Sequence, residues 1–197
     1  FAGFCLLIGV PLRFDAQLTA ACWAVQGLGH LWLGVRQRRT WPQWWGTLIQ
    51  LLAGGAFLVD LVDTLWDTPL THFSPFLNHL YMGALILSIA AILSATIVRR
   101  STASVHDKIA PLAYGLLVLG LLWWYAGGIG QFAFYAQRTD RLALLLLFIT
   151  ISGVFGDGYG AWVQWRAPRY TLWTVLPAAA LLAVSMFVWA AHPFAYG

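Results

Sequence analysis

Long, uninterrupted apolar runs are the feature that most restricts how this chain can fold. They are separated by short polar stretches and cover residues 18–35, 44–62, 79–98, 109–125, 142–163 and 172–192. A helix rises 1.5 Å per residue, so about 20 apolar residues cross the roughly 30 Å of hydrocarbon in a bilayer. Each run is close to that length, which predicts one membrane-spanning helix per run. The shorter alternating segments of a membrane β-barrel are not seen.

Composition points the same way. Of the 197 residues, 60% are hydrophobic and only 9% are charged, whereas a soluble domain has about 25% charged residues. So few charges cannot cover a water-exposed surface, but lipid accepts apolar side chains at no cost. We therefore predict an all-α, polytopic transmembrane helical bundle of about six full spans.

The chain begins in an unusual way. Residue 1 is Phe, and the opening apolar run, residues 1–12, is too short to span and has no basic flank like that of a signal peptide. We interpret it as a truncated first helix. Residues 1–197 are then a single transmembrane region and a fragment of a larger multi-pass protein, whose remaining helices would be partners of this one.

The loops predict an orientation. Most of the 11 basic residues flank the connections after the second, fourth and sixth helices, counting the truncated helix as the first. These residues are Arg36, Arg38, Arg39, Arg99, Arg100, Lys108, Arg166 and Arg169. The others, Arg13, Arg138 and Arg141, flank the opposite side. The positive-inside rule then makes the loops near Arg38, Arg100 and Arg166 cytoplasmic and the loop near Asp67 periplasmic, in a bacterial inner membrane.

Aromatic residues gather at the predicted helix ends, where an indole ring can lie in apolar surroundings with its N–H in the headgroup zone. The inner belt comprises Trp41, Trp44, Trp45, Trp162, Trp165 and Trp173, and the outer belt comprises Trp66, Trp123, Trp124, Tyr125 and Trp189. Glycines predict close helix contacts, above all the GxxxG spacing of Gly156 and Gly160.

Three stretches together resemble a bacterial family of predicted multi-pass membrane proteins, domain of unknown function 2339. They are residues 18–39 (LTAACWAVQG continuing to LWLGVRQRR), the Pro75–Asn78 segment that opens a long apolar helix, and Gly120–Gly128 (GLLWWYAGG). Family members usually carry a glutamate where this chain has Gln26. The resemblance implies a longer parent with more helices, and it implies no activity, cofactor or catalytic set.

Asp157 is the most notable ionisable residue. If the sixth run continues as a helix to Arg166, Asp157 lies roughly 13 Å from its inner end. An acid at that depth usually faces the bundle interior or water. The functional interpretation is a proton or cation relay or a substrate contact. The structural interpretation is a protonated or hydrogen-bonded side chain in a glycine-rich turn.

His30 is a second candidate. It lies one helical turn after Gln26 on the same face, so the two form a small polar stripe. His30 could act as a base near neutral pH. The alternative is a packed, hydrogen-bonded histidine that joins helices.

The outer connection offers a third set, Asp63 and His72, with further polar residues at Asp60, Asp67, Asn78 and His79. Carboxylates and imidazoles together can bind a cation or perform acid–base chemistry. They lack any fixed ligand spacing, and a solvated loop collects the same residue types. We predict no metal and no cofactor. Nucleic-acid binding is not expected, because no soluble basic module is present.

Two classes of function remain open. The first is a non-enzymatic scaffold or conduit module of a larger cell-envelope protein, in contact with the lipid bilayer. The second is a membrane-embedded enzyme that acts on a lipid-linked or glycan substrate at the periplasmic face. The first is favoured, since no group of residues fills the roles that a reaction requires.

Overall fold

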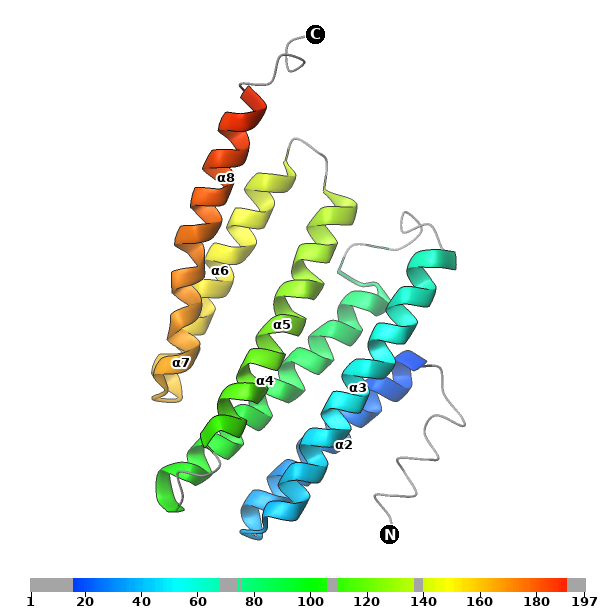
Figure 1. Cartoon of the computed structure of the whole chain (residues 1–197), viewed down its shortest axis with the longest axis vertical. Helices are drawn as coiled ribbons and strands as arrows, with labels where there is room; N and C mark the ends of the chain where they lie inside the picture. The colour runs from blue at the N-terminus through cyan, green and yellow to red at the C-terminus, as the bar shows by residue number, and fades with distance from the viewer. Residues whose placement is uncertain (1–15, 68–73, 75, 106–109, 137–139, 191–197) are drawn as a thin grey trace. The chain divides into compact units, whose positions relative to one another are not determined.

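The structure is a computed structural model that describes residues 16–67, 74, 76–105, 110–136 and 140–190. All elements within these ranges are helices (Figure 1). The chain divides into two compact units, residues 1–134 and residues 135–197, which are described separately. The predicted truncated first helix, residues 1–12, lies outside the described residues.

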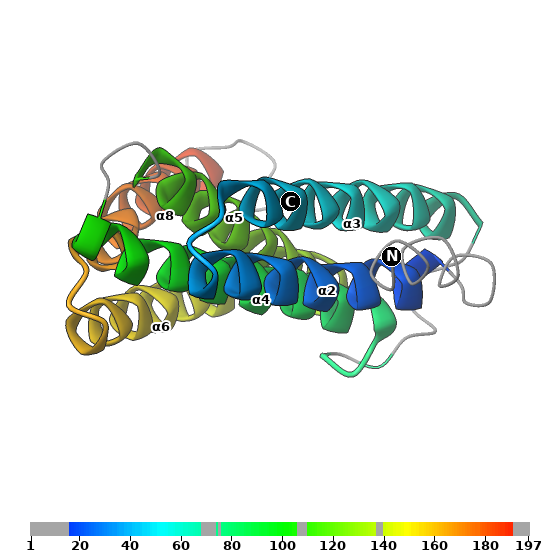
Figure 2. The same ribbon diagram turned by 90° about the horizontal axis from the view of Figure 1, so that it is seen from below.

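Unit 1 contains four long helices. They are α2 (Ala16–Arg36), α3 (Thr40–Asp67), α4 (His79–Val105) and α5 (Ala110–Tyr135). Helices α2 and α3 form a hairpin, and α4 packs against both; Figure 2 shows α2 and α3 lying side by side along their length. Ala20, Ala24, Ala53 and Ala84 surround Phe57 in the core. Such small residues bring helix backbones close together, which is how helices gain contact in lipid.

Helix α3 begins earlier than the sequence predicted. The apolar run predicted a helix from residue 44, but the helix begins at Thr40 and includes Pro42. A proline in the first helical turn lacks only an N–H that would have no partner inside the helix anyway. Pro42 therefore stays inside the helix that it was expected to precede.

Helix α5 continues well beyond its predicted end at Tyr125, to Tyr135. Trp123 consequently lies in the middle of the helix and not in an outer aromatic belt. Its ring packs edge-on against Phe57, with ring centroids 5.4 Å apart. A methyl group added at Gly54 would lie 2.9 Å from the Trp123 ring, so Gly54 makes room for this contact.

Unit 2 contains α6 (Arg141–Trp162), the short α7 (Arg166–Arg169), the 3₁₀ helix η3 (Tyr170–Thr174) and α8 (Val175–Ala190). Helices α6 and α8 run side by side, joined through α7 and η3 (Figure 1). The Thr171 hydroxyl donates to the Pro168 carbonyl oxygen at 2.7 Å. Thr171 and the glycines Gly153 and Gly160 are buried where the two arms of this hairpin meet.

The two units contain the same type of helix-ending turn. After α2, the amides of Arg38 and Arg39 donate to the carbonyl oxygens of Val35 and Gly34, and Arg38 has a φ of 54°. After α6, the amides of Gln164 and Trp165 donate to Ala161 and Gly160, and Gln164 has a φ of 53°. This is the Schellman arrangement, which satisfies the last carbonyl groups of a helix. We call these two turns the first corner and the second corner.

The corners also share their glycine contact. A methyl group added at Gly34 would lie 2.9 Å from the amide nitrogen of Gln43, and one at Gly160 would lie 3.2 Å from the amide nitrogen of Arg169. In each corner a proline, Pro42 or Pro168, precedes the contacted residue. The predicted packing role of Gly160 is confirmed, and Gly156 likewise contacts Thr171. Gly158 faces open space.

Four helices in the described chain have the length and apolar composition to cross a membrane. They are Thr40–Thr64, His79–Ser101, Pro111–Phe132 and Arg141–Trp162. Helix α2 is not among them although it has 21 residues, and α8 has 16 residues in the described range. The described part of the fold is therefore all-helical with four candidate spans, and the number of about six full spans stays a prediction.

Candidate functional site

Asp157, the leading candidate from the sequence, forms an ion pair. The Nε of Arg169 donates to Asp157 Oδ1 at 2.7 Å. The Asp157 side chain is 38% exposed and that of Arg169 is 52% exposed, so the pair lies at the surface of unit 2. Asp157 is thus a paired carboxylate and not a lone acid. Sequence reasoning used Arg169 only as a topology marker and missed this contact.

The predicted distance of Asp157 from the inner end of its helix was too large, because it was measured to Arg166. The helix ends at Trp162, and the second corner turns the chain before Arg166. Asp157 is therefore only about 7 Å from the helix end, at 1.5 Å per residue. After this turn the chain runs back alongside α6. Arg169, the last residue of α7, therefore lies beside Asp157. A sequence signal for this turn does exist. Pro168 follows Gly160 at the same spacing at which Pro42 follows Gly34 in the first corner.

The ion pair borders a cavity of about 300 Å³ in unit 2. The residues that line it are Asp157, Arg166, Arg169, Tyr170, Leu172 and Trp173. We call this the corner pocket. Two guanidinium groups and one carboxylate give it an excess of positive charge. Trp173 and Trp162 are both largely exposed, as expected for belt residues at a helix end, whereas Trp165 of the predicted inner belt is buried.

His30 stays on its own helix. Its Nδ1 lies 2.9 Å from the carbonyl oxygen of Gln26, within hydrogen-bond distance. Gln26 and His30 lie one turn apart on α2, as predicted, and the His30 ring contacts the backbone of this helix. A ring nitrogen that bonds a helix carbonyl is held in one orientation, which agrees with the structural interpretation of His30.

The outer candidates are not brought together into one site by the described residues. Asp63 is exposed on the last turns of α3, and His72 lies outside the described residues. Asn78 is buried and caps α4: its Oδ1 accepts from the Tyr81 amide at 2.8 Å, and its Nδ2 donates to Gln131 Oε1 at 2.8 Å. In the part of the chain that the structure describes, no group of three His, Cys, Asp or Glu residues could hold a metal.

Unit 1 contains a second buried polar contact that the sequence did not indicate. Gln50 Nε2 on α3 donates to Ser94 Oγ on α4 at 2.6 Å, and both side chains are buried. Gln50 Oε1 has no hydrogen-bond partner among the described residues. In lipid an amide side chain gains by bonding across helices, so this contact joins α3 to α4.

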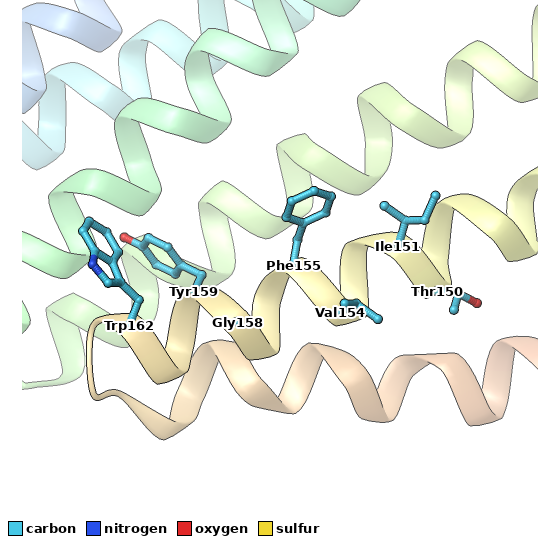
Figure 3. Close-up of a pocket in the computed structure, with 7 residues that line it drawn as sticks. All are labelled: Thr150, Ile151, Val154, Phe155, Gly158, Tyr159 and Trp162. Atoms are coloured by element: carbon cyan, nitrogen blue, oxygen red, sulfur yellow. The ribbon is translucent and has the colours of Figure 1, made fainter.

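An apolar groove of about 700 Å³ runs along α6. It is lined by Thr150, Ile151, Val154, Phe155, Gly158, Tyr159 and Trp162. Figure 3 shows Phe155, Tyr159 and Trp162 pointing away from α8. Its described lining residues all belong to α6, and only Thr150 and Tyr159 among them carry hydroxyl groups. This surface suits lipid chains or neighbouring helices more than a reaction.

The arrangement defines a class of protein: a helical membrane protein with four candidate spans and a charged pocket beside the end of one of them. No family model, no curated protein and no solved structure matches the chain.

Proposed function

We propose that the chain is a non-enzymatic module of a larger cell-envelope protein, embedded in the bacterial inner membrane as a scaffold or conduit. The observation that carries this proposal is how the buried polar groups of unit 1 are used. Gln50 on α3 bonds Ser94 on α4, and Asn78, the residue that precedes α4, bonds Gln131 on α5. Buried polar side chains that hydrogen-bond to one another and so hold helices together support a structural role.

The charges of the described spans support the same proposal. Arg99 and Arg100 lie at one end of the α4 span, and Asp60 and Asp63 lie at one end of the α3 span. Asp157, which lies five residues inside the end of its span Arg141–Trp162, is neutralised by Arg169. A paired carboxylate near the headgroup layer supports a scaffold more than a proton relay through the bilayer, because a relay needs a group that exchanges protons at depth.

The finer architecture is part of the proposal. We propose that α2 and α8 also cross the bilayer, which gives about six full spans after a truncated first helix. The loops near Arg38, Arg100 and Arg166 would be cytoplasmic and the loop near Asp67 periplasmic. The resemblance to the family of domain of unknown function 2339 supports a longer, bacterial parent.

The test is a set of substitutions in the full-length protein, scored by envelope integrity of the cells at equal protein levels. A scaffold predicts that Asp63→Ala and His72→Ala keep the wild-type phenotype, as does the control Asp140→Ala at another exposed acid. The alternative enzyme at the periplasmic face predicts loss in Asp63→Ala and His72→Ala but not in the control. That result would overturn the proposal.

The same assay separates a scaffold from a conduit. A conduit that uses Asp157 predicts that Asp157→Asn abolishes function, whereas a scaffold predicts that function persists because asparagine can still accept a hydrogen bond from Arg169 Nε. Loss of function in Asp157→Asn with normal folding would reject the scaffold and favour the conduit.

A further inference from the structure

The corner pocket has hydrogen-bond donors that the protein itself leaves unused. Among the described residues, Asp157 contacts only Nε of Arg169, so the terminal Nη atoms of Arg169 are available to a ligand. Arg166 is exposed, and it makes no hydrogen bond or ion pair within the described residues. With one carboxylate against two guanidinium groups, the pocket has a net charge that attracts an anion. Arginine forks bind phosphate oxygens in a bidentate way.

The first corner shows that these charges are not needed to form the turn. There the main-chain hydrogen bonds, the left-handed residue, the glycine contact and the proline are all repeated. At the positions equivalent to Asp157, Arg166 and Arg169, the first corner has Leu31, Thr40 and Gln43. An uncharged set therefore builds the same geometry. The charges of the second corner require another explanation.

The surroundings of the pocket favour a ligand that is anionic at one end and apolar at the other. Arg166 lies four residues beyond the end of the candidate span Arg141–Trp162, where the hydrocarbon of a bilayer would give way to headgroups. Tyr170 and Trp173 are 64% and 67% exposed beside the arginines. Leu172 and the exposed Leu176 continue the apolar surface along α8. A cavity of 300 Å³ is at the lower limit of small-ligand sites, roughly 300–1,000 Å³.

We propose that the corner pocket binds the phosphate group of an anionic phospholipid, with Arg166 and the Nη groups of Arg169 as donors. Tyr170 and Trp173 flank the headgroup, and the acyl chains lie along the apolar surface of η3 and α8. Basic pockets beside membrane helices recognise lipid headgroups in this way. The inference requires that the chain lies in a bilayer, but it does not depend on whether the chain is a scaffold, a conduit or an enzyme.

The experiment measures binding of a short-chain phosphatidylglycerol to the purified full chain in a zwitterionic detergent by titration calorimetry. Arg166→Gln is expected to weaken binding about tenfold, as expected for the loss of one charge-assisted hydrogen bond. Arg166→Lys should keep part of the affinity, because it retains the charge but not the fork. The matched control is Arg38→Gln, which removes an exposed arginine from the first corner and should leave binding unchanged.

Asp157→Asn gives a test of opposite sign. It removes the negative charge that opposes an anion in the pocket, although asparagine can still accept from Arg169 Nε, so it should tighten phosphatidylglycerol binding. Equal weakening by Arg166→Gln and Arg38→Gln would show that only the overall charge matters and would overturn the site. Unchanged binding in Arg166→Gln, or weaker binding in Asp157→Asn with normal folding, would do the same.

A parallel titration with inorganic phosphate distinguishes the source of the phosphate group. The lipid proposal predicts that phosphatidylglycerol binds much more tightly than inorganic phosphate and than short-chain phosphatidylcholine. Tight binding of inorganic phosphate that depends on Arg166, with no preference for the lipid, would overturn the lipid as ligand and assign the pocket to a soluble phosphate. Either result is independent of the phenotype assay for the proposed function.

Discussion

Arg38 and Gln164 both adopt a left-handed backbone conformation, with φ values of 54° and 53°. For a residue with a Cβ this conformation costs about 1–2 kcal/mol, because the Cβ approaches a carbonyl oxygen. Glycine is the usual residue here, and its absence concealed both corners from the sequence. The corners persist because main-chain hydrogen bonds and the glycine contacts at Gly34 and Gly160 offset that cost.

Replacing Gln164 by glycine should stabilise the protein. Glycine removes the Cβ strain at a φ of 53° but raises the conformational entropy of the unfolded chain. The free energy of unfolding should therefore rise by about 0.5–1 kcal/mol. Val163→Gly is the control one residue earlier, at a φ of −85° where glycine brings no relief; it should destabilise. Unfolding in mixed detergent measures both. A Gln164→Gly variant no more stable than wild type would contradict the expectation.

Gly160 should be intolerant of a methyl group. In Gly160→Ala the new Cβ would lie 2.8 Å from the Trp165 carbonyl oxygen and would also meet the Arg169 side chain. The expected destabilisation is about 1–3 kcal/mol, as for other overpacked sites. Gly158→Ala on the same helix has open space around it and should be neutral or slightly stabilising. Thermal unfolding of the two variants makes the comparison, and equal midpoints would argue against a close contact at Gly160.

At the scale of elements, helix interiors were predictable and helix ends were not. The predicted runs at residues 18–35 and 142–163 match α2 and α6 to within about two residues, the ordinary uncertainty of a helix boundary. The run predicted to end at Tyr125 fell short, because α5 continues through the glycines that follow it to Tyr135. Glycine is common inside membrane helices and so marks their ends poorly.

The contact between α3 and α4 gives a prediction for an element pair. A double-mutant cycle with Gln50→Leu and Ser94→Ala should return a coupling energy near 0.6 kcal/mol, which is the average for hydrogen bonds between membrane helices. Gln50→Leu alone should cost little more, because Gln50 Oε1 already has no partner. Unfolding in detergent mixtures supplies the four free energies. A coupling indistinguishable from zero would mean that this 2.6 Å contact contributes nothing.

At the scale of the whole molecule, the membrane class followed from composition and run length, but the partner of Asp157 did not. Asp157 stands out as an acid within an apolar run, which needs no structure to notice. Arg169 becomes its partner only because the chain turns between Trp162 and Arg166. The sequence shows that the two residues lie on successive elements, but it does not give the angle at which the chain turns between them. Asp157 could thus be predicted as a candidate site residue, whereas its ion pair with Arg169 could not.

The proposed orientation predicts which positions an impermeant thiol reagent reaches in intact cells. With the native cysteines replaced, Ser74→Cys should be labelled from outside, since it lies near the loop at Asp67. Gln37→Cys and Gln164→Cys should react only after the cells are permeabilised, because they lie in the corners beside Arg38 and Arg166. All three positions are exposed. Labelling of Gln37→Cys in intact cells would reverse the orientation.

The two corners are closed only by groups that lie within a few residues of one another along the chain. Contacts that are local in sequence form early and require no distant segment. During synthesis, α2 and α3 can therefore pair as soon as both have left the ribosome, before α4 exists. The α6–α8 hairpin of unit 2 can form in the same way, because its corner is closed by equally local contacts.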